Sequence, residues 1–335
     1  MDFRLDDAQV ALAETIAAFC ADRVPLDRIA ERDSVPADAM MWAGLAELGI
    51  FGLLVPESAG GFGATMVDAA VALEQLGAAL VPGPVLWSCV GASLVPAAID
   101  GSERITGTLI DDTPGSLVID HGDQVDRVLV VHADRIESCA TASLTLSARD
   151  DSHAFDPLTS EVTLTTIPNG EIVGDADASA ALRCRGTVLA AAQLVGVAQG
   201  ALTVARDYAL QRHQFGVPIG SFQAIKHLLA DSYVRVELAR NATYAAAAIL
   251  DDPTSGDASS AMSTAKLLAG DAGIANARTA VQVLGGMGFT WEMLPHYYLK
   301  RAWVLEQSFG TADQHAAALG DVLASDALIG AGAWT

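Results

Sequence analysis

The first hundred residues carry the apolar spacing of helices. From Val10 onward, apolar residues recur every three or four positions, which places them on one face of an α-helix. A helix is therefore expected to begin near Asp6, where carboxylates suit its positive end. Two more helices are expected at 37–48 and 66–80, and the segment Pro82-Gly83-Pro84 ends the last of them.

The pattern changes between residues 101 and 178. Segments there are short and rich in Val, Leu and Thr, and turn sequences such as Pro168-Asn169-Gly170 separate them. Short β-rich runs between turn signals are typical of strands. We therefore expect a small β domain with strands at 116–119, 127–132, 143–147 and 161–167.

Beyond residue 178 the chain returns to long apolar-periodic runs. Four helices are expected, and their short connections favour an antiparallel bundle. The predicted fold is mainly α with a small middle β domain: an N-terminal helical domain at 1–100, a reduced β domain at 101–178 and a C-terminal four-helix bundle at 179–335. The four bundle helices are expected at 179–212, 223–250, 259–284 and 302–325.

The strongly negative net charge of the chain argues against two classes of function. The chain of 335 residues has 41 acidic and 19 basic residues and a formal net charge of −22. Nucleic-acid binding and attachment to anionic lipid both need basic groups, so neither is expected. The uncharged stretch 186–205 is long enough for a membrane span, but its Gln and Thr residues favour a helix buried in a bundle.

The start of the chain and its cysteines point to a reducing compartment. Met1 is followed by Asp2-Phe3-Arg4 and not by a basic head and an apolar run, so no signal peptide is expected. The four cysteines are widely spaced without a CxxC pair, and His296 and His315 lack ligand spacing, so no metal site is expected. We expect a cytoplasmic protein.

Two segments between long helices carry candidate chemistry. In Arg212-His213-Gln214-Phe215-Gly216, an arginine beside a glycine turn is suited to grip a phosphate, and Phe215 offers a flat apolar surface. An ordinary interhelix loop with a solvated arginine explains the same residues. In Gln282-Val283-Leu284-Gly285-Gly286-Met287-Gly288, glycines let a backbone approach a ligand closely, but a glycine-rich helix end is also common. No strand precedes this segment, so it is not a Rossmann fingerprint.

Taken together and in this order, the motifs resemble those of the acyl-CoA dehydrogenase family. The resemblance covers nearly the whole chain. It rests on Leu45-Ala46-Glu47-Leu48-Gly49-Ile50, Val55-Pro56-Glu57, Gly60-Gly61-Phe62-Gly63, Phe155-Asp156-Pro157, the Arg212 loop with Phe222-Gln223, Ala230-Asp231, the Gln282 turn and Phe309-Gly310-Thr311.

This resemblance implies a flavoenzyme in which two subunits share each FAD. One subunit cradles the flavin ring, and its neighbour holds the adenosine diphosphate end. A glutamate removes a proton next to the thioester carbonyl, and a hydride passes to the flavin. By this resemblance, the residues that would grip FAD are Arg212, Gln214, Phe215, Gln282, Gly285 and Gly286, with Phe222 and Gln223 lining the same groove.

The chain departs from the family at the catalytic base. One family position for the glutamate, directly before Gly-Thr near the C-terminus, is Phe309 here, and the other falls at Gly186. Neither side chain can accept a proton, so no catalytic residue is assigned. Asp271 and Glu306 are carboxylates of the bundle, but neither occupies a family base position. The flavin-contacting Thr-Glu-Pro and Trp-x-Thr segments are also missing between 101 and 178, so the chain is not expected to hold the ring alone.

These departures resemble the short subunit of heterotetrameric (α2β2) acyl-CoA dehydrogenases of actinobacterial steroid catabolism. The resemblance implies an acyl-CoA substrate and an electron-transfer flavoprotein as electron acceptor. It also implies that the chain is active only together with a longer partner subunit, which supplies the catalytic base. Gly288-Phe289-Thr290-Trp291-Glu292 and Lys300-Arg301-Ala302 are similar to this subgroup. Two alternatives stay open: a self-sufficient homo-oligomer that uses Glu306 or Asp271, and an inactive scaffold or acyl-CoA binder.

Overall fold

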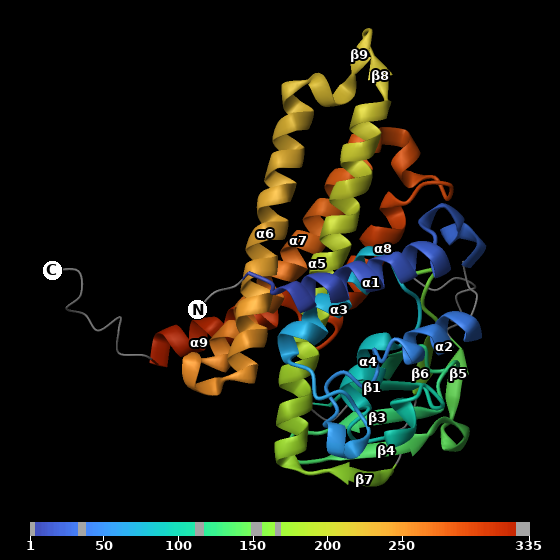
Figure 1. The fold of residues 1–335 in the computed structure, drawn as a ribbon, viewed down its shortest axis with the longest axis vertical. Coiled ribbons are helices and arrows are strands. Elements are labelled where there is room, and N and C mark those ends of the chain that lie inside the picture. The colour runs from blue at the N-terminus through green and yellow to red at the C-terminus, as the bar shows by residue number, and fades with distance from the viewer. Residues whose placement is uncertain (1–3, 33–37, 111–116, 149–155, 165–168, 326–335) are drawn as a thin grey trace, which may run out of the picture.

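The computed structural model describes residues 4–32, 38–110, 117–148, 156–164 and 169–325. N-terminal helices pack against the long helices that follow the β region, and the strands between residues 105 and 174 gather at one end of the molecule (Figure 1). The predicted class, mainly helical with a middle β region, is confirmed.

The N-terminal helices begin at capped positions. The Gln9 amide donates to the Asp6 carboxylate at 2.8 Å, so the first helix begins where the sequence predicts. Thr65 caps the third helix in the same way. The α-helices that the structure describes in this region are α1 (Asp7–Arg23), α2 (Ala39–Glu47), α3 (Met66–Ala78) and α4 (Val85–Gly91).

The β region forms two sheets. In one, the strand order is β1-β3-β4-β7, with β1 parallel to β3 and the other pairs antiparallel. The other is antiparallel with the order β2-β6-β5. The strands are β1 (Ile105–Leu109), β2 (Leu117–Asp120), β3 (Arg127–Val131), β4 (Ile136–Ala140), β5 (Leu146–Ala148), β6 (Glu161–Leu164) and β7 (Glu171–Gly174).

Long helices follow the strands. The helix α5 (Ala176–Gln211) has 36 residues and packs on α3, α6 and α7. A two-stranded hairpin, β8 (His213–Gln214) with β9 (Val217–Pro218), joins it to the next helix. The remaining helices are α6 (Gln223–Asp251), α7 (Ala258–Leu284), α8 (Pro295–Gln307) and α9 (Ala312–Ser325).

The expected single helix at 302–325 is wrong. The chain forms α8 and α9 instead, and the break falls at Phe309 and Gly310, whose φ angles are 57° and 96°. A left-handed backbone cannot continue a right-handed helix, so the chain turns there.

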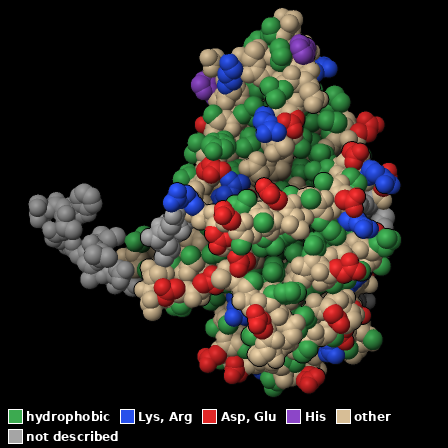
Figure 2. Space-filling view, in the orientation of Figure 1, with side chains coloured by type: hydrophobic (Ala, Val, Ile, Leu, Met, Phe, Trp, Pro, Cys, Tyr) green, Lys and Arg blue, Asp and Glu red, His purple; other side chains and the backbone are tan. Residues whose placement is uncertain are grey.

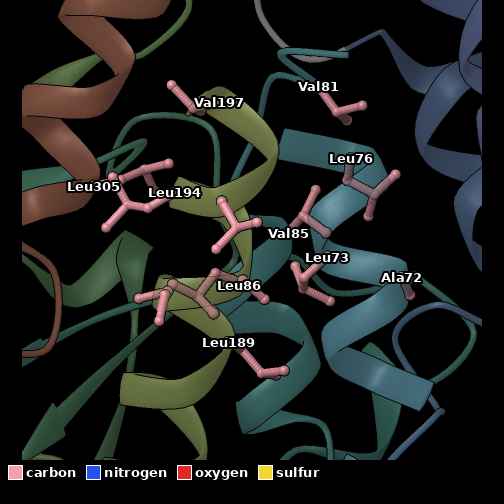
Figure 3. Close-up of a cluster of buried hydrophobic side chains, with 14 of the residues drawn as sticks. Ala72, Leu73, Leu76, Val81, Val85, Leu86, Leu189, Leu194, Val197 and Leu305 are labelled. Carbon is pink, nitrogen blue, oxygen red and sulfur yellow. The ribbon is translucent and has the colours of Figure 1, made fainter. Parts of the chain in front are cut away.

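The hydrophobic core lies where the N-terminal helices meet the bundle. Figure 3 shows Leu73 and Leu76 of α3 gathered with Leu86 of α4 and Leu189 and Leu194 of α5. Within the described residues, α5 alone is long and apolar enough to cross a membrane, and 83% of its apolar window is buried inside the protein. The prediction of a buried helix at 186–205 is therefore confirmed.

Candidate nucleotide loop and cleft

The Arg212 loop forms the tip of the molecule. The helix α5 ends at Gln211, and the β8–β9 hairpin turns through Phe215 and Gly216, whose φ angles are 54° and 83°. The tip lies at the opposite end of the molecule from the strands (Figure 1). The Phe215 side chain is 93% exposed, so the loop presents its groups away from the body of the chain.

The tip is basic although the whole chain is strongly acidic. Residues 206–235 carry four basic and two acidic side chains. Arg212 is exposed and makes no ion pair with any described residue. Blue and purple side chains appear at this end in Figure 2, whereas red ones spread over the rest of that face. An unpaired guanidinium at a basic tip is suited to bind an anion such as a diphosphate.

Two rings flank the hairpin. Phe215 and Phe222 meet edge to face, with ring centroids 6.2 Å apart and planes at 88°. Gln223 follows as the first residue of α6 and is exposed. Together they offer a planar ligand an apolar surface beside hydrogen-bonding groups.

The glycine turn lies near the tip. The helix α7 ends at Leu284, and Gly285 has a φ of 63°. A Cβ at Gly285 or Gly286 would have no heavy atom within 4 Å, so the backbone there is open to a ligand. The Tyr208 hydroxyl, one turn before Arg212, lies 3.9 Å from the sulfur of Met287. This contact brings the two predicted phosphate-binding segments to the same end of the bundle. Gln282, in the last turn of α7, is exposed.

The two positions at which the family carries its base lie against each other. A Cβ on Gly186 would stand 2.0 Å from Cε1 of Phe309, so the phenyl ring occupies the space over the glycine. Phe309 is only 5% exposed, and its ring lies 4.7 Å from that of Trp87. At this point an apolar ring stands where a proton acceptor would be needed.

The turn that carries Phe309 is held by buried groups of α7 and α9. The Lys266 ammonium donates to the carbonyls of Glu306 at 2.7 Å and Gly310 at 2.6 Å. The Nε2 atom of His315 lies 3.0 Å from the Phe309 carbonyl. Burial lowers the pKa of Lys266 to about 8. These bonds fix the left-handed turn and, with it, the direction of the phenyl ring.

The two carboxylates considered as substitute bases, Glu306 and Asp271, do not line the cavity beside Phe309, which is called the cleft below. Glu306 accepts from the Ala312 amide at 2.7 Å, where it caps the start of α9. Asp271 lies exposed on α7 and is not among the lining residues. The geometry therefore gives neither residue access to a ligand in the cleft.

Sequence reasoning missed two carboxylates that do line the cleft. The cavity next to Phe309 has a volume of about 730 Å³. Asp120 of β2 and Glu161 of β6 are directly opposite each other in the register of the antiparallel pair. Burial, and then the Glu161 carboxylate, raise the pKa of Asp120 to about 7. The other lining residues are Trp87, Gly107, Thr108, Leu109, Trp303, Val304, Gln307, Ser308, Phe309, Gly310 and Gln314.

Comparison with known families agrees with this architecture. Residues 6–106 match the model of the acyl-CoA dehydrogenase N-terminal domain, and residues 185–324 match that of the C-terminal domain. The chain is 34% identical to acyl-CoA dehydrogenase IpdE2 of Mycobacterium tuberculosis, over 87% of this chain and 89% of the relative. It is 35% identical to FadE34 of the same organism, over 81% of this chain, and spans 40% of that longer protein.

Solved structures share the fold. One is a chain of the ChsE4-ChsE5 complex from Mycobacterium tuberculosis, with a TM-score of 0.85 and 24% identity over 97% of this chain and 99% of that one. Another is a chain of the Tcur3481-Tcur3483 steroid acyl-CoA dehydrogenase variant, with a TM-score of 0.82 and 22% identity over 95% and 98%. The domain matches and the IpdE2 relationship together show that this chain belongs to the acyl-CoA dehydrogenase family.

Proposed function

We propose that this chain is a subunit of a heteromeric (α2β2) FAD-dependent acyl-CoA dehydrogenase that holds the nucleotide end of a cofactor seated in its partner. The partner supplies the flavin cradle and the catalytic glutamate. The observation that carries this proposal is the distance, within one chain, between the Arg212 loop at the tip and the cleft beside Phe309.

The separation follows from helix geometry. Gly186, which packs under the Phe309 ring that lines the cleft, lies on α5, and Arg212 follows 26 residues later at the end of the same helix. At a rise of 1.5 Å per residue, these positions are about 39 Å apart. The five-carbon ribityl chain between a flavin ring and its diphosphate is far too short for that span. An FAD gripped by Arg212 would therefore have its ring away from this chain's own cleft, which supports a ring seated in another subunit.

The residues at the tip fit the nucleotide end of FAD. The Arg212 guanidinium would pair with the diphosphate, and the open backbone at Gly285 and Gly286 would approach it closely. Phe215 and Phe222 would pack on the adenosine. When bound, FAD accepts the hydride. In this chain the Phe309 ring fills the space over Gly186, so both family base positions lack a proton acceptor, and we assign proton removal to the partner.

The names of similar proteins suggest the substrate class. ChsE4-ChsE5 and Tcur3481-Tcur3483 are described as pairs of proteins, and the second as a steroid acyl-CoA dehydrogenase. We extend both features to this chain and propose a steroid side-chain CoA thioester as the substrate of the complex. An electron-transfer flavoprotein would reoxidise the flavin.

Co-purification with a longer, glutamate-bearing acyl-CoA dehydrogenase subunit tests the proposal. We expect the complex to hold FAD and to turn over, and Arg212→Ala to weaken FAD binding. A hydrogen bond to a charged group contributes about 1.5–3 kcal/mol, which corresponds to roughly a 10- to 150-fold weaker affinity. Arg23→Ala, at the exposed end of α1, is the control. If the partner alone binds FAD fully and is equally active, the proposal fails.

The same preparations separate the alternatives. A lone chain that is yellow and is bleached anaerobically by an acyl-CoA would indicate a self-sufficient enzyme. Asp120→Asn would then be the variant to assay, because Asp120 lines the cleft whereas Glu306 and Asp271 do not. A scaffold predicts that Arg212→Ala leaves FAD content unchanged in every complex.

A further inference from the structure

A small polar chamber adjoins the cleft. It has a volume of about 40 Å³ and shares Trp87, Asp120, Val304 and Ser308 with the larger cavity, so the two lie next to each other. Its floor is formed by side chains from three regions of the chain that are distant in sequence. These additional polar residues are His121 after β2, Gln193 of α5 and Arg301 of α8.

Each of these three side chains has a buried polar atom that lacks a partner within the described residues. The atoms are Nδ1 of His121, Oε1 of Gln193 and Nη2 of Arg301, in residues that are 6%, 7% and 7% exposed. Leaving a buried polar group unpaired costs about 1–3 kcal/mol, so such groups mark a place where a ligand or water completes the hydrogen bonds. Three of them around one chamber indicate a site.

Two of the three groups can accept a hydrogen bond. Gln193 presents its amide oxygen. Burial lowers the pKa of His121 to about 3, so its imidazole is neutral and one ring nitrogen is an acceptor. The third, Nη2 of Arg301, is a donor, and its charge is already paired with Asp156 at 2.5 Å. A water fits beside it, since one water occupies about 30 Å³ of liquid.

The charges of the larger cavity favour a cation. Asp120 and Glu161 line it, and no lysine, arginine or histidine is among its described lining residues. Arg301 lines the adjoining chamber, but its charge is paired with Asp156, so the two acidic side chains leave an excess of negative charge that repels phosphates and carboxylates. The rings of Trp87, Trp303 and Phe309 line the same space, and aromatic faces attract organic cations.

We propose that this cleft binds an organic amine whose protonated nitrogen lies between Asp120 and Gln193 and whose apolar body lies among the three rings. The N–H groups of the amine donate to the Asp120 carboxylate and to the unpartnered Gln193 oxygen. At about 730 Å³ the cavity has the size of a small-molecule site. This site is independent of the nucleotide loop at the tip and does not depend on the FAD proposal.

Isothermal titration of the full-length chain tests this inference with two probes of equal shape. The first is 2-phenylethylamine, which is protonated at pH 7.5 because an alkylamine has a pKa of about 10, similar to that of lysine. The second is 2-phenylethanol, which is neutral. We expect saturable binding of the amine, at least tenfold tighter than any binding of the alcohol. Equal affinity for both, or no saturable binding of the amine, overturns the proposal.

Matched variants locate the site. The double variant Asp120→Asn with Glu161→Gln should weaken amine binding at least tenfold. The control is Glu14→Gln with Asp22→Asn, which removes the same charge from the exposed face of α1 and should leave binding unchanged. Gln193→Met, a second variant in the chamber, should also weaken the amine, and circular dichroism checks that each variant is folded. Binding that is equally strong in all of them overturns the proposal.

Discussion

Gly186→Ala is the substitution that most directly tests the packing of the two family base positions. The added Cβ would stand 2.0 Å from Cε1 and 2.3 Å from Cζ of Phe309. The ring cannot move freely, because Trp87 lies on one side and its own backbone is held in a left-handed turn. Overpacking of a core costs about 1–3 kcal/mol. Glycine to alanine inside a helix gains about 1 kcal/mol in propensity, so the net loss is about 0–2 kcal/mol.

The effect of Gly186→Ala on the free energy of unfolding should change sign when the Phe309 ring is removed. Phe309→Ala by itself should cost about 3–5 kcal/mol, because it empties a buried aromatic site. In that background the clash is gone, and Gly186→Ala should stabilise the helix by up to about 1 kcal/mol. The coupling between the two substitutions is then roughly 1–3 kcal/mol, which is typical of residues in direct contact.

Guanidinium denaturation followed by far-UV circular dichroism measures the four members of this cycle. Gly320→Ala is the control, since Gly320 lies in the exposed helix α9 and a Cβ there meets nothing within 4 Å. It should stabilise the wild type and the Phe309→Ala variant equally. If Gly186→Ala costs the same in both backgrounds, the phenyl ring does not occupy the space over Gly186 and the reasoning is wrong.

Two further predictions concern buried charges. Arg301→Met should cost about 3–5 kcal/mol in the same denaturation assay, because it leaves the fully buried Asp156 carboxylate without its partner, and adding Asp156→Asn should recover part of the loss. Burial lowers the pKa of Lys266 to about 8 from 10.5, so the unfolded chain binds more protons between those pH values. The free energy of unfolding of the wild type relative to that of Lys266→Met should therefore rise by about 3 kcal/mol from pH 8 to 10.5. A difference that does not change with pH would contradict the lowered pKa of Lys266.

Helices with a clear period were predictable, and irregular or very short elements were not. The 66–80 run carries a capping threonine and a proline stop, and α3 forms there. The strand β1 (Ile105–Leu109) was missed because its five residues include a glycine and two threonines and only two large apolar side chains. The helix α4 was missed because a seven-residue apolar run after Pro-Gly-Pro has no visible period.

The candidate site residues also divide into those that local sequence indicates and those that only the tertiary fold brings together. The Arg212 and Gln282 segments could be proposed from the sequence because each is local: its candidate chemistry lies within a few consecutive residues. Asp120 and Glu161 were not found, because they are 41 positions apart and come together only through the register of β2 with β6. Likewise, the approach of Phe309 to Gly186 depends on how the turn after α8 packs against α5, which no local pattern specifies.

The length of α5 gives this chain two independent binding ends. Between Arg185 and Arg206 the helix is uncharged and mostly buried between α3 and α7, so it acts as a rigid rod and cannot bring its ends together. With the diphosphate of FAD held at the tip, as proposed above, the cleft at the other end is under no requirement to hold the flavin ring. We infer that Phe309 at the family base position leaves the cleft available for a different ligand. A variant that abolishes amine binding should therefore leave FAD retention in the complex unchanged, whereas Arg212→Ala should do the reverse. Loss of both functions in either variant would show that the two ends are coupled.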